Sequence, residues 1–266
     1  LYRNVFSVGA LTLVSRVFGF VRDALMAAVL GVSAVSDAFA AAFRFPNLFR
    51  RLFAEGAFNT AFVPMYAEAV ETRGAEGARE LAGMSWLVAV ILVVTVLVEV
   101  FAGQIMVAFV PGFVADADKF ELTVFLTRIM FPYLACMSLM AAYAAILNSV
   151  GRFFAAAVAP ILLNIVNIAA LVPLAILALD APDTAFWVAI ATMLGGIAQL
   201  SLVYAPIRRA GIRPRLRLPR LDSDVRKFWV LAVPAILAGG ITQINIFVGT
   251  IIASGANEVM SIIYNA

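Results

Sequence analysis

The sequence contains no histidine and a single cysteine, Cys136, in 266 residues. Histidine is the usual acid/base group near neutral pH and a common metal ligand. One thiol can form neither a disulfide framework nor a thiolate metal site. With no nucleophile and base pair in view, we predict that the protein is not an enzyme, and we expect no catalytic residue and no metal. Cys136 lies in an apolar run and is interpreted as a small packing residue.

Charged residues are also scarce, at 13% of the chain against 64% hydrophobic residues, and the mean hydropathy is +1.02. Soluble domains carry about 25% charged and roughly 45–50% apolar residues. The composition is therefore that of an integral membrane protein. An unpaired backbone cannot face lipid, and the apolar runs lack the alternating period of two that marks a barrel strand. We predict an all-α integral membrane protein.

Several apolar runs reach the length of about 20 residues that a membrane-spanning helix needs. They cover residues 5–30, 36–69, 81–110, 122–150, 155–179, 184–207 and 228–253. The first run is not typical of a cleavable signal peptide, because Arg16, Arg22 and Asp23 interrupt it. An eighth run begins near residue 257 and stops before it could span, so we expect the chain to be an N-terminal fragment.

The connections between these runs alternate between basic and non-basic, which is the pattern of the positive-inside rule. This predicts a multi-pass protein with a cytoplasmic N-terminus. The arginine-rich segment 208–220 is interpreted as a topology determinant near anionic membrane lipids, and we expect no nucleic-acid partner. As the longest polar segment, it divides the chain into six helices at 1–210, a cytoplasmic basic loop at 211–224, and helix seven with the first turns of helix eight at 225–266.

Charges nevertheless occur inside the first two runs. A helical wheel at about 100° per residue gives the first run one polar arc. That arc contains Gly9, Thr12, Ser15, Arg16, Gly19, Arg22 and Asp23. An arginine at the centre of a lipid-exposed helix costs about 2.5–3.5 kcal/mol. The polar arc is therefore expected to face water or protein.

The second run carries the stretch "RFPNLFRRLFAEGAF" at 44–58. On a regular helix Asn47, Arg51 and Glu55 share one face, and Arg50 points about 100° away from Arg51. One of these two arginines is therefore expected to face a cavity, while the other pairs with Glu55 or reaches the cytoplasmic interface. Together the two runs contain more arginines than acids: Arg16, Arg22, Arg44, Arg50 and Arg51 against Asp23, Asp37 and Glu55.

This surplus of positive charge predicts a cavity for an anion. Unpaired cations in a low-dielectric cavity attract negative charge, and the planar arginine fork donates two parallel hydrogen bonds to phosphate or carboxylate. A second hypothesis stays open, in which the arginines and acids pair only with one another and join the two helices. Polar residues in the later spans are interpreted as interhelical hydrogen-bond partners: Asn164, Asn167, Gln199, Gln243 and Asn245.

Several motifs are specific enough to indicate a family. They include "SRVFGFVRDAL" at 15–25, "SDAF" at 36–39, "FPNLFRRLFAEGAFNTAFVP" at 45–64, "PGF" at 111–113, "FPY" at 131–133 and "APILLN" at 159–164. In this order, along nearly the whole chain, the sequence resembles the bacterial lipid II flippase family MurJ, also called MviN. That family belongs to the multidrug/oligosaccharidyl-lipid/polysaccharide exporter superfamily.

The resemblance implies a polytopic helical transporter of fourteen helices. Helices one to six form an N-lobe, seven to twelve a C-lobe, and two more a groove for the lipid tail. The chain would supply the six-helix N-lobe, helix seven and the start of helix eight. A further family arginine on helix eight follows a sequence like "YNA" and would lie beyond Ala266, as would most of a C-lobe in which some members hold sodium.

The resemblance also implies an activity in the bacterial cytoplasmic (inner) membrane. The family moves lipid II, the undecaprenyl-pyrophosphate-linked precursor of peptidoglycan, from the cytoplasmic to the outer leaflet by alternating access. The implied partners are lipid II, membrane lipids and other proteins of cell-wall synthesis. No cofactor is implied. Since the sequence has no P-loop pattern, we expect the membrane potential or an ion gradient to supply the energy.

By the same resemblance, the substrate-binding residues are Arg16, Arg22, Arg50, Asp23, Asp37, Asn47 and Glu55. The three arginines match the family's essential arginines and would bind the pyrophosphate. Asp23 and Asp37 match its essential or cavity-edge acids, and Asn47 and Glu55 match the polar motif of its second helix. Glu99 departs from the family pattern, and both an outer-leaflet interfacial position and a cavity role stay open for it.

Two alternative functions also stay open. The cargo could be another polyprenyl-linked glycan, or the protein could be a membrane scaffold for cell-wall synthesis whose arginines serve only internal pairing. An antiporter of cationic drugs would need an excess of cavity acids, which is the reverse of the surplus found here.

Overall fold

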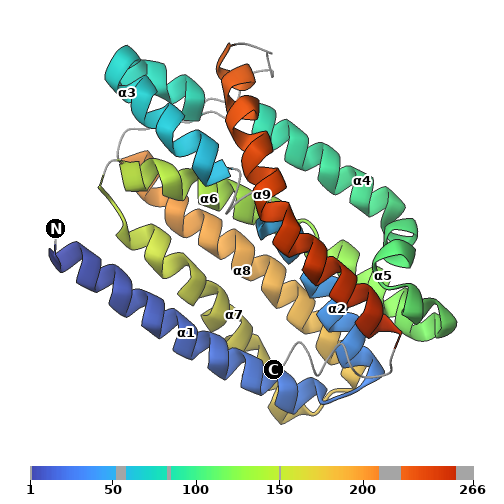
Figure 1. The fold of residues 1–266 in the computed structure, drawn as a ribbon. Coiled ribbons are helices and arrows are strands. Elements are labelled where there is room, and N and C mark those ends of the chain that lie inside the picture. Colours follow the sequence, from blue (N-terminus) through green and yellow to red (C-terminus); the bar gives the residue numbers. More distant parts are fainter. Residues whose placement is uncertain (1, 52–57, 83–84, 150, 210–222, 256–266) are drawn as a thin grey trace.

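The computed structural model describes residues 2–51, 58–82, 85–149, 151–209 and 223–255, and these residues form helices joined by short connections (Figure 1). The elements are α1 (Tyr2–Leu30), α2 (Ala34–Phe49), α3 (Phe58–Ala82), α4 (Ser85–Phe109), the 3₁₀ helix η2 (Pro111–Ala115), α5 (Ala117–Met130), α6 (Tyr133–Ser149), α7 (Phe154–Leu177), α8 (Ala181–Arg209) and α9 (Ser223–Ser254). Within these residues there is no strand, and the all-α prediction is confirmed.

Five segments of the described chain are long and apolar enough to cross a membrane. They are Val88–Phe109, Ala117–Asn148, Phe154–Leu177, Ala181–Arg209 and Ser223–Ser254. The first two predicted runs, which contain Arg16, Arg22, Arg44, Arg50 and Arg51, are not among them. The protein is thus a polytopic helical membrane protein whose most charged helices need protein or water beside them.

Two of the predicted runs are broken. The run at 36–69 contains α2 and α3, which are separated by residues outside the described set. The run at 122–150 is divided at Phe131 and Pro132 into α5 and α6, because proline interrupts the helical hydrogen-bond ladder. Between the predicted runs 36–69 and 81–110, α3 continues to Ala82 but is broken at Gly74, whose backbone is not helical (φ 67°, ψ −177°).

Helix α7 packs against α1 on one side and α8 on the other, and α8 also packs against α6. Two adjacent glycines of α8 allow these close approaches. A Cβ on Gly195 would lie 2.5 Å from Leu163 Cδ1 of α7, and a Cβ on Gly196 would lie 2.5 Å from Tyr133 Cδ2 of α6. Small residues have this role in membrane helix bundles, where close backbone packing supplies much of the association energy.

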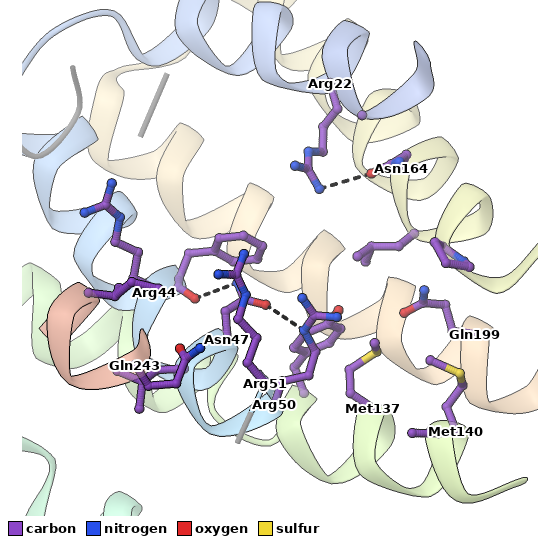
Figure 2. Close-up of a pocket in the computed structure, with 18 of the residues that line it drawn as sticks. Arg22, Arg44, Asn47, Arg50, Arg51, Met137, Met140, Asn164, Gln199 and Gln243 are labelled. Carbon is purple, nitrogen blue, oxygen red and sulfur yellow. Dashed lines mark hydrogen bonds between the residues drawn. The ribbon is translucent and has the colours of Figure 1, made fainter. Parts of the chain in front are cut away.

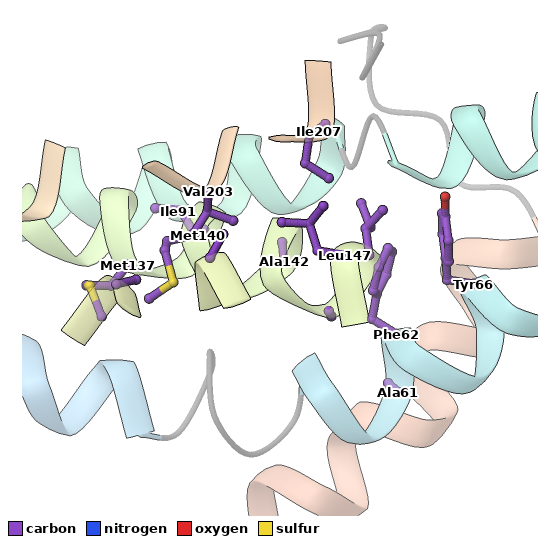
Figure 3. Packing of buried hydrophobic residues seen from close by; sticks show 14 of the residues in the cluster. Ala61, Phe62, Tyr66, Ile91, Met137, Met140, Ala142, Leu147, Val203 and Ile207 are labelled. Carbon is purple, nitrogen blue, oxygen red and sulfur yellow. The ribbon is translucent and has the colours of Figure 1, made fainter. Parts of the chain in front are cut away.

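The largest apolar cluster joins α3, α6, α8 and the beginning of α9 (Figure 3). Phe62 of α3 stacks on Tyr66 at a centroid distance of 5.7 Å, and Val203 and Phe228 contribute from α8 and α9. The buried residues of α9 gather near its two ends, with Gln243 between them: Val225, Phe228, Ala232, Gln243, Thr250, Ala253 and Ser254. Helix α9 therefore docks mainly at these positions, and much of the rest of its surface is exposed.

The predicted division into 1–210, 211–224 and 225–266 stays a prediction. Nearly all of the predicted basic loop lies outside the described residues, as does the predicted start of helix eight. On the far side of that loop, α9 packs against α3 and α4. The first helix of the expected C-lobe is thus in direct contact with the six-helix unit.

Candidate functional site

A cavity of about 730 Å³ lies among α1, α2, α6, α7, α8 and α9 (Figure 2). Its polar lining residues are Arg22, Arg44, Asn47, Arg50, Arg51, Asn164, Gln199 and Gln243. Apolar side chains such as Tyr133, Met137 and Leu163 complete the wall. Among the described residues that line the cavity there is no aspartate and no glutamate. The cavity therefore has a net positive wall, as the surplus of arginine in the sequence predicts.

Helix α2 supplies most of this charge. Arg44, Asn47 and Arg51 recur at the helical spacing of three and four residues, which places them on one face. Asn47 is held by its Nδ2, which donates to the Phe43 carbonyl at 2.9 Å, and its Oδ1 accepts from Arg50 Nε at 3.1 Å. The orientation of Arg50 is thus fixed by the residue one turn before it.

The turn of α2 widens to a π-turn at Arg50 and Arg51. A π-turn changes the angular step between residues, and such turns are frequent at functional sites. Both arginines line the cavity, whereas a regular helical wheel sends one of them away from it. Arg51 is also exposed, and its predicted alternative partner Glu55 lies outside the described residues, so the predicted division of roles between the two arginines stays a prediction.

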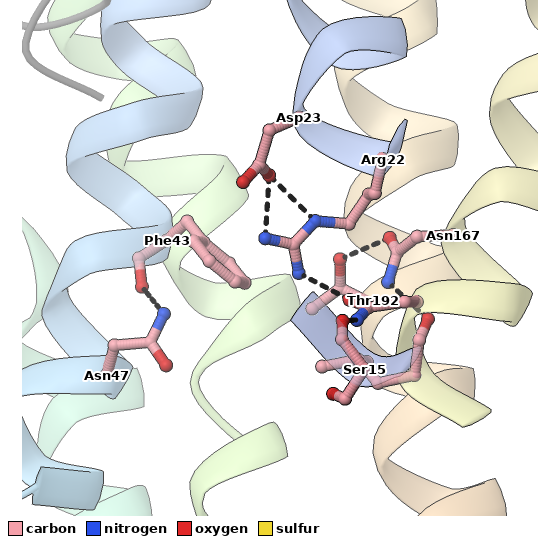
Figure 4. A network of polar contacts seen from close by, with 9 residues as sticks. Ser15, Arg22, Asp23, Phe43, Asn47, Asn167 and Thr192 are labelled. Carbon is pink, nitrogen blue, oxygen red and sulfur yellow. Dashed lines mark hydrogen bonds and ion pairs between the residues drawn. The ribbon is translucent and has the colours of Figure 1, made fainter. Parts of the chain in front are cut away.

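Arg22 of α1 is held from two sides (Figure 4). Its Nη1 donates to Asn164 Oδ1 of α7 at 3.0 Å, and its Nε and Nη2 donate to Asp23 Oδ1 at 2.9 and 2.7 Å. Asn164 in turn donates from Nδ2 to the Ser15 carbonyl at 3.1 Å. The Arg22 side chain is 16% exposed and that of Asp23 is 40% exposed. Asn164 therefore aims the guanidinium, and a half-exposed acid balances part of its charge.

Carboxamides form another part of the wall. Gln199 Nε2 donates to the Ala159 carbonyl of α7 at 2.7 Å. This contact directs the Nε2 atom toward α7 and leaves the Oε1 atom at the other end of the amide. Gln199 Oε1 and Gln243 Oε1 are buried and have no hydrogen-bond partner among the described residues. Since unsatisfied buried acceptors are unfavourable, these two oxygens suit a hydroxyl or amide donor from water or cargo.

The polar residues of α7 and α8 also join these helices. Thr192 donates from Oγ1 to Asn167 Oδ1 at 3.0 Å, and Asn167 Nδ2 donates to the Leu163 carbonyl at 3.0 Å. The interhelical interpretation is confirmed for Asn164, Asn167 and Gln199. Asn245 is exposed on α9.

The predicted site residues are only partly gathered at the cavity. Arg22, Asn47 and Arg50 line it, and Asp23 pairs with Arg22 from outside the lining. Three other residues do not line it or cannot be placed. Arg16 is exposed on α1, Asp37 is fully buried at the start of α2 beside Lys119, and Glu55 lies outside the described residues. The binding role of all seven residues stays a prediction.

The sequence counted Arg44 and Arg51 in the surplus of positive charge without naming them as binding residues, and both line the cavity. Lys119, the buried partner of Asp37, was not singled out, and it lies in a stretch with the acids Asp116, Asp118 and Glu121. Glu99 lies on α4 and does not line the cavity. Its Oε1 is buried without a hydrogen-bond partner among the described residues.

A bundle of membrane-crossing helices with a positively charged cavity among α1, α2, α6, α7, α8 and α9 is typical of the class of polytopic membrane transporters. A family model described as "Lipid II flippase MurJ" matches residues 26–266 of the chain. The chain belongs to this family, and the resemblance drawn from the sequence is confirmed.

Curated relatives agree with this membership. A protein of Rhizobium tropici named probable lipid II flippase MurJ is 49% identical over 261 residues, which is 96% of this chain and 48% of the relative. A protein of the same name from Rhizobium meliloti (strain 1021) is 46% identical, over 99% of this chain and 50% of the relative. The chain thus spans about half the length of the curated relatives it matches.

Solved structures give the same fold. The structure titled "Lipid II flippase MurJ, inward closed conformation" matches with a TM-score of 0.75 and 25% identity, over 95% of this chain and 52% of that one. A multidrug resistance transporter of the MATE family, in the MOP superfamily, matches with a TM-score of 0.70 and 17% identity, over 94% and 56%. The second likeness is one of fold alone.

Proposed function

We propose that the chain is part of a flippase that moves lipid II from the cytoplasmic to the outer leaflet of the bacterial cytoplasmic membrane. The observation that supports this most is the cavity of about 730 Å³ with Arg22, Arg44, Arg50 and Arg51 in its wall and no acid among its described lining residues. The names of the relatives point to the same cargo.

The chemistry of the cavity fits a diphosphate. Guanidinium groups donate paired, charge-assisted hydrogen bonds to phosphate oxygens. Arg22 and Arg50 come from different helices, so they can approach a diphosphate from two sides. The orphaned carboxamide oxygens of Gln199 and Gln243 offer acceptors for the neutral hydroxyl and amide groups that a sugar headgroup carries.

Transport in this proposal follows alternating access. The cavity lies where α9 meets the six-helix unit, and transporters of repeated bundles bind cargo between their halves. The remaining C-lobe would close the cavity from the other side and rock against the N-lobe. The lipid tail stays in the membrane, so the cavity need hold only the headgroup.

The topology and energy source belong to the same proposal. The alternation of basic connections supports a cytoplasmic N-terminus. The membrane potential or an ion gradient would drive the cycle, and sodium would bind in the rest of the C-lobe. No cofactor, catalytic residue or nucleic-acid partner is proposed. Partners are lipid II, membrane lipids and other cell-wall synthesis proteins.

The full-length protein tests this proposal in two measurements, lipid II binding by native mass spectrometry and support of growth in a strain that depends on the gene. We expect Arg22→Gln and Arg50→Gln each to lower binding at least about tenfold and to abolish growth, because each removes a charge-assisted contact. Arg209→Gln, which changes an exposed arginine at the end of α8, is the matched control.

Normal growth with Arg22, Arg44 and Arg50 all replaced would overturn the assignment. Competition between lipid II and another polyprenyl-linked glycan separates the cargoes, since both carry a diphosphate. Headgroup binding that does not respond to Arg22→Gln would instead favour a scaffold.

A further inference from the structure

A buried ion pair lies at the start of α2, at the opposite end of this helix from the arginines. Lys119 Nζ of α5 lies 2.7 Å from Asp37 Oδ2, and the two side chains are 6% and 0% exposed. The same Nζ lies 4.0 Å from the centroid of the Phe113 ring in η2. Lys119 therefore connects α2 to η2 through one ion pair and one cation–π contact.

The 3₁₀ helix η2 in turn contacts the end of α9. The Gly112 N–H donates to Ser254 Oγ at 3.1 Å, and Ser254 Oγ donates to the Ile251 carbonyl at 2.7 Å. A Cβ on Gly112 would clash with the carbonyl oxygen and the carbonyl carbon of Ser254. Because both of these are backbone atoms, no side chain fits at position 112 while α9 is in place.

Aromatic rings fill the space behind this contact. Phe109 at the end of α4 lies 5.5 Å from Phe247 of α9 and 5.1 Å from Phe45 of α2, between ring centroids. Along α9, Phe247 lies between Gln243 at the cavity and Ser254 at the contact with η2. Gly249, two residues beyond Phe247, still lines the cavity, so the contact between Gly112 and Ser254 lies one to two turns past the last described lining residue of α9.

We propose that Asp37 and Lys119 are positioning residues that hold η2 against the end of α9 and so close the cavity at this end. We call Asp37, Lys119, Phe113, Gly112 and Ser254 the α9 seal. The inference rests on the proposed function, in which this end faces outward and the seal must part for cargo to leave. It gives Asp37 a role at the exit, in place of direct contact with the diphosphate.

The contacts of the Asp37–Lys119 pair support a role in closing the cavity rather than in stabilising the fold alone. The pair alone would join α2 and α5, which already pack closely. Through Phe113, however, it fixes a short helix that contacts α9, the first helix of the expected C-lobe. Breaking the pair is therefore expected to free η2 and to loosen the contact between the lobes.

The test measures water access to the cavity from outside the cell. In the full-length protein with its native cysteines replaced, including Cys136→Ala, the variant Ala141→Cys puts a reporter thiol in the cavity wall. A charged, membrane-impermeant thiol reagent is added to intact cells, and the labelling rate is measured. We expect Asp37→Asn and Gly112→Ala each to raise this rate about tenfold or more, because loss of one partner of a buried pair, or a backbone clash, shifts the closed state strongly.

Two variants are matched controls. Gly103→Ala adds the same methyl group on α4, where a Cβ meets nothing within 4 Å, and Asp118→Asn removes an exposed acid from the same turn of α5. Both should label at the unmodified rate. Should Asp37→Asn fail to insert, Phe113→Leu removes the ring face and keeps an apolar side chain, and it should also raise the rate.

The α9 seal would be overturned by an unchanged labelling rate in both Gly112→Ala and Asp37→Asn once each is inserted in the membrane. Where Asp37→Asn does not insert, Phe113→Leu takes its place in this comparison. The readout needs no lipid II, so it is independent of the cargo. If labelling rises as expected but substitution of the cavity arginines does not change lipid II binding, the α9 seal is supported and the proposed cargo is contradicted.

Discussion

The two ends of α2 use charge in opposite ways. At the end that begins near Ser36, Asp37 is fully buried and paired with Lys119, whose charge also lies over an aromatic ring. At the other end, Arg44, Arg50 and Arg51 line a cavity that no described acid shares. One helix thus carries a neutralised pair and a surplus of cations about two to four turns apart.

The difference separates structural charge from binding charge. A buried pair that is broken leaves one uncompensated ion, so its first effect is on stability and shape. Cations beside a cavity have water or an anion to solvate them, so removing one changes affinity more than stability. Substitutions at the two ends should therefore separate into two groups.

The largest expected effect is at the buried pair. Asp37→Ala should lower the stability of the purified full-length protein by about 3–5 kcal/mol, because Lys119 is left without its partner. Thermal unfolding measures this, with Asp118→Ala as a control that stays within about 0.5 kcal/mol. Replacing both partners, Asp37→Leu with Lys119→Met, should recover most of the loss. A native melting temperature for Asp37→Ala alone would contradict the structural role.

The next effect is at the cavity arginines. Arg44→Gln and Arg50→Gln should each weaken lipid II binding by about 1.5–3 kcal/mol, the usual value of a hydrogen bond to a charged group. Arg50→Lys should lose less, since it keeps the charge and loses only the fork. Binding is measured by native mass spectrometry and stability by thermal unfolding. If these variants lost much stability but bound lipid II with unchanged affinity, the arginines would have a structural role like that of Asp37 and Lys119.

A smaller effect is expected where Asn164 aims Arg22. Asn164→Ala removes the acceptor of the bond from Arg22 Nη1, and Arg22 then keeps only its contacts to Asp23 among those described above. We expect binding to weaken by about 1 kcal/mol. Asn148→Ala, at an exposed position on α6, is the control. An effect as large as that of Arg22→Gln would mean that Asn164 contacts the cargo itself.

The smallest effect is expected at the exposed ion pairs between α3 and α9. Arg73 Nη1 lies 2.7 Å from Asp224 Oδ2, and Lys227 Nζ lies 2.5 Å from Glu68 Oε2. Asp224→Asn and Glu68→Gln should each cost about 0–1 kcal/mol, and added salt should remove the difference. If either substitution lowered the stability as much as Asp37→Ala does, solvent exposure would not explain the difference between the exposed ion pairs and the buried Asp37–Lys119 pair.

Much of the fold could be predicted from hydropathy and proline. Apolar length placed the later spans, including Ala117–Asn148, which the structure divides into two helices at Phe131 and Pro132. Residues 71–80 connect two predicted runs, and there α3 is broken at Gly74, where glycine allows a positive φ.

The candidate site was predicted by charge balance and by family resemblance, and less well by helical geometry. Asp37 was expected near the substrate, yet its partner Lys119 comes from a helix 82 positions along the chain. No spacing rule relates two such residues. Likewise a helical wheel assumes a regular angular step, which the π-turn at Arg50 and Arg51 does not keep.

By itself the sequence determined that this chain enters a membrane as helices and carries more cations than it can neutralise within its first two spans. These properties follow from composition and local order, since lipid leaves the backbone no other partner than itself. The folded arrangement of helices then buries Asp37 against Lys119 and gathers Arg22, Arg44, Arg50 and Arg51 around one cavity. That arrangement depends on contacts between distant helices, where Asp37 meets Lys119 and Arg22 meets Asn164, and on the close packing of Gly112 against α9.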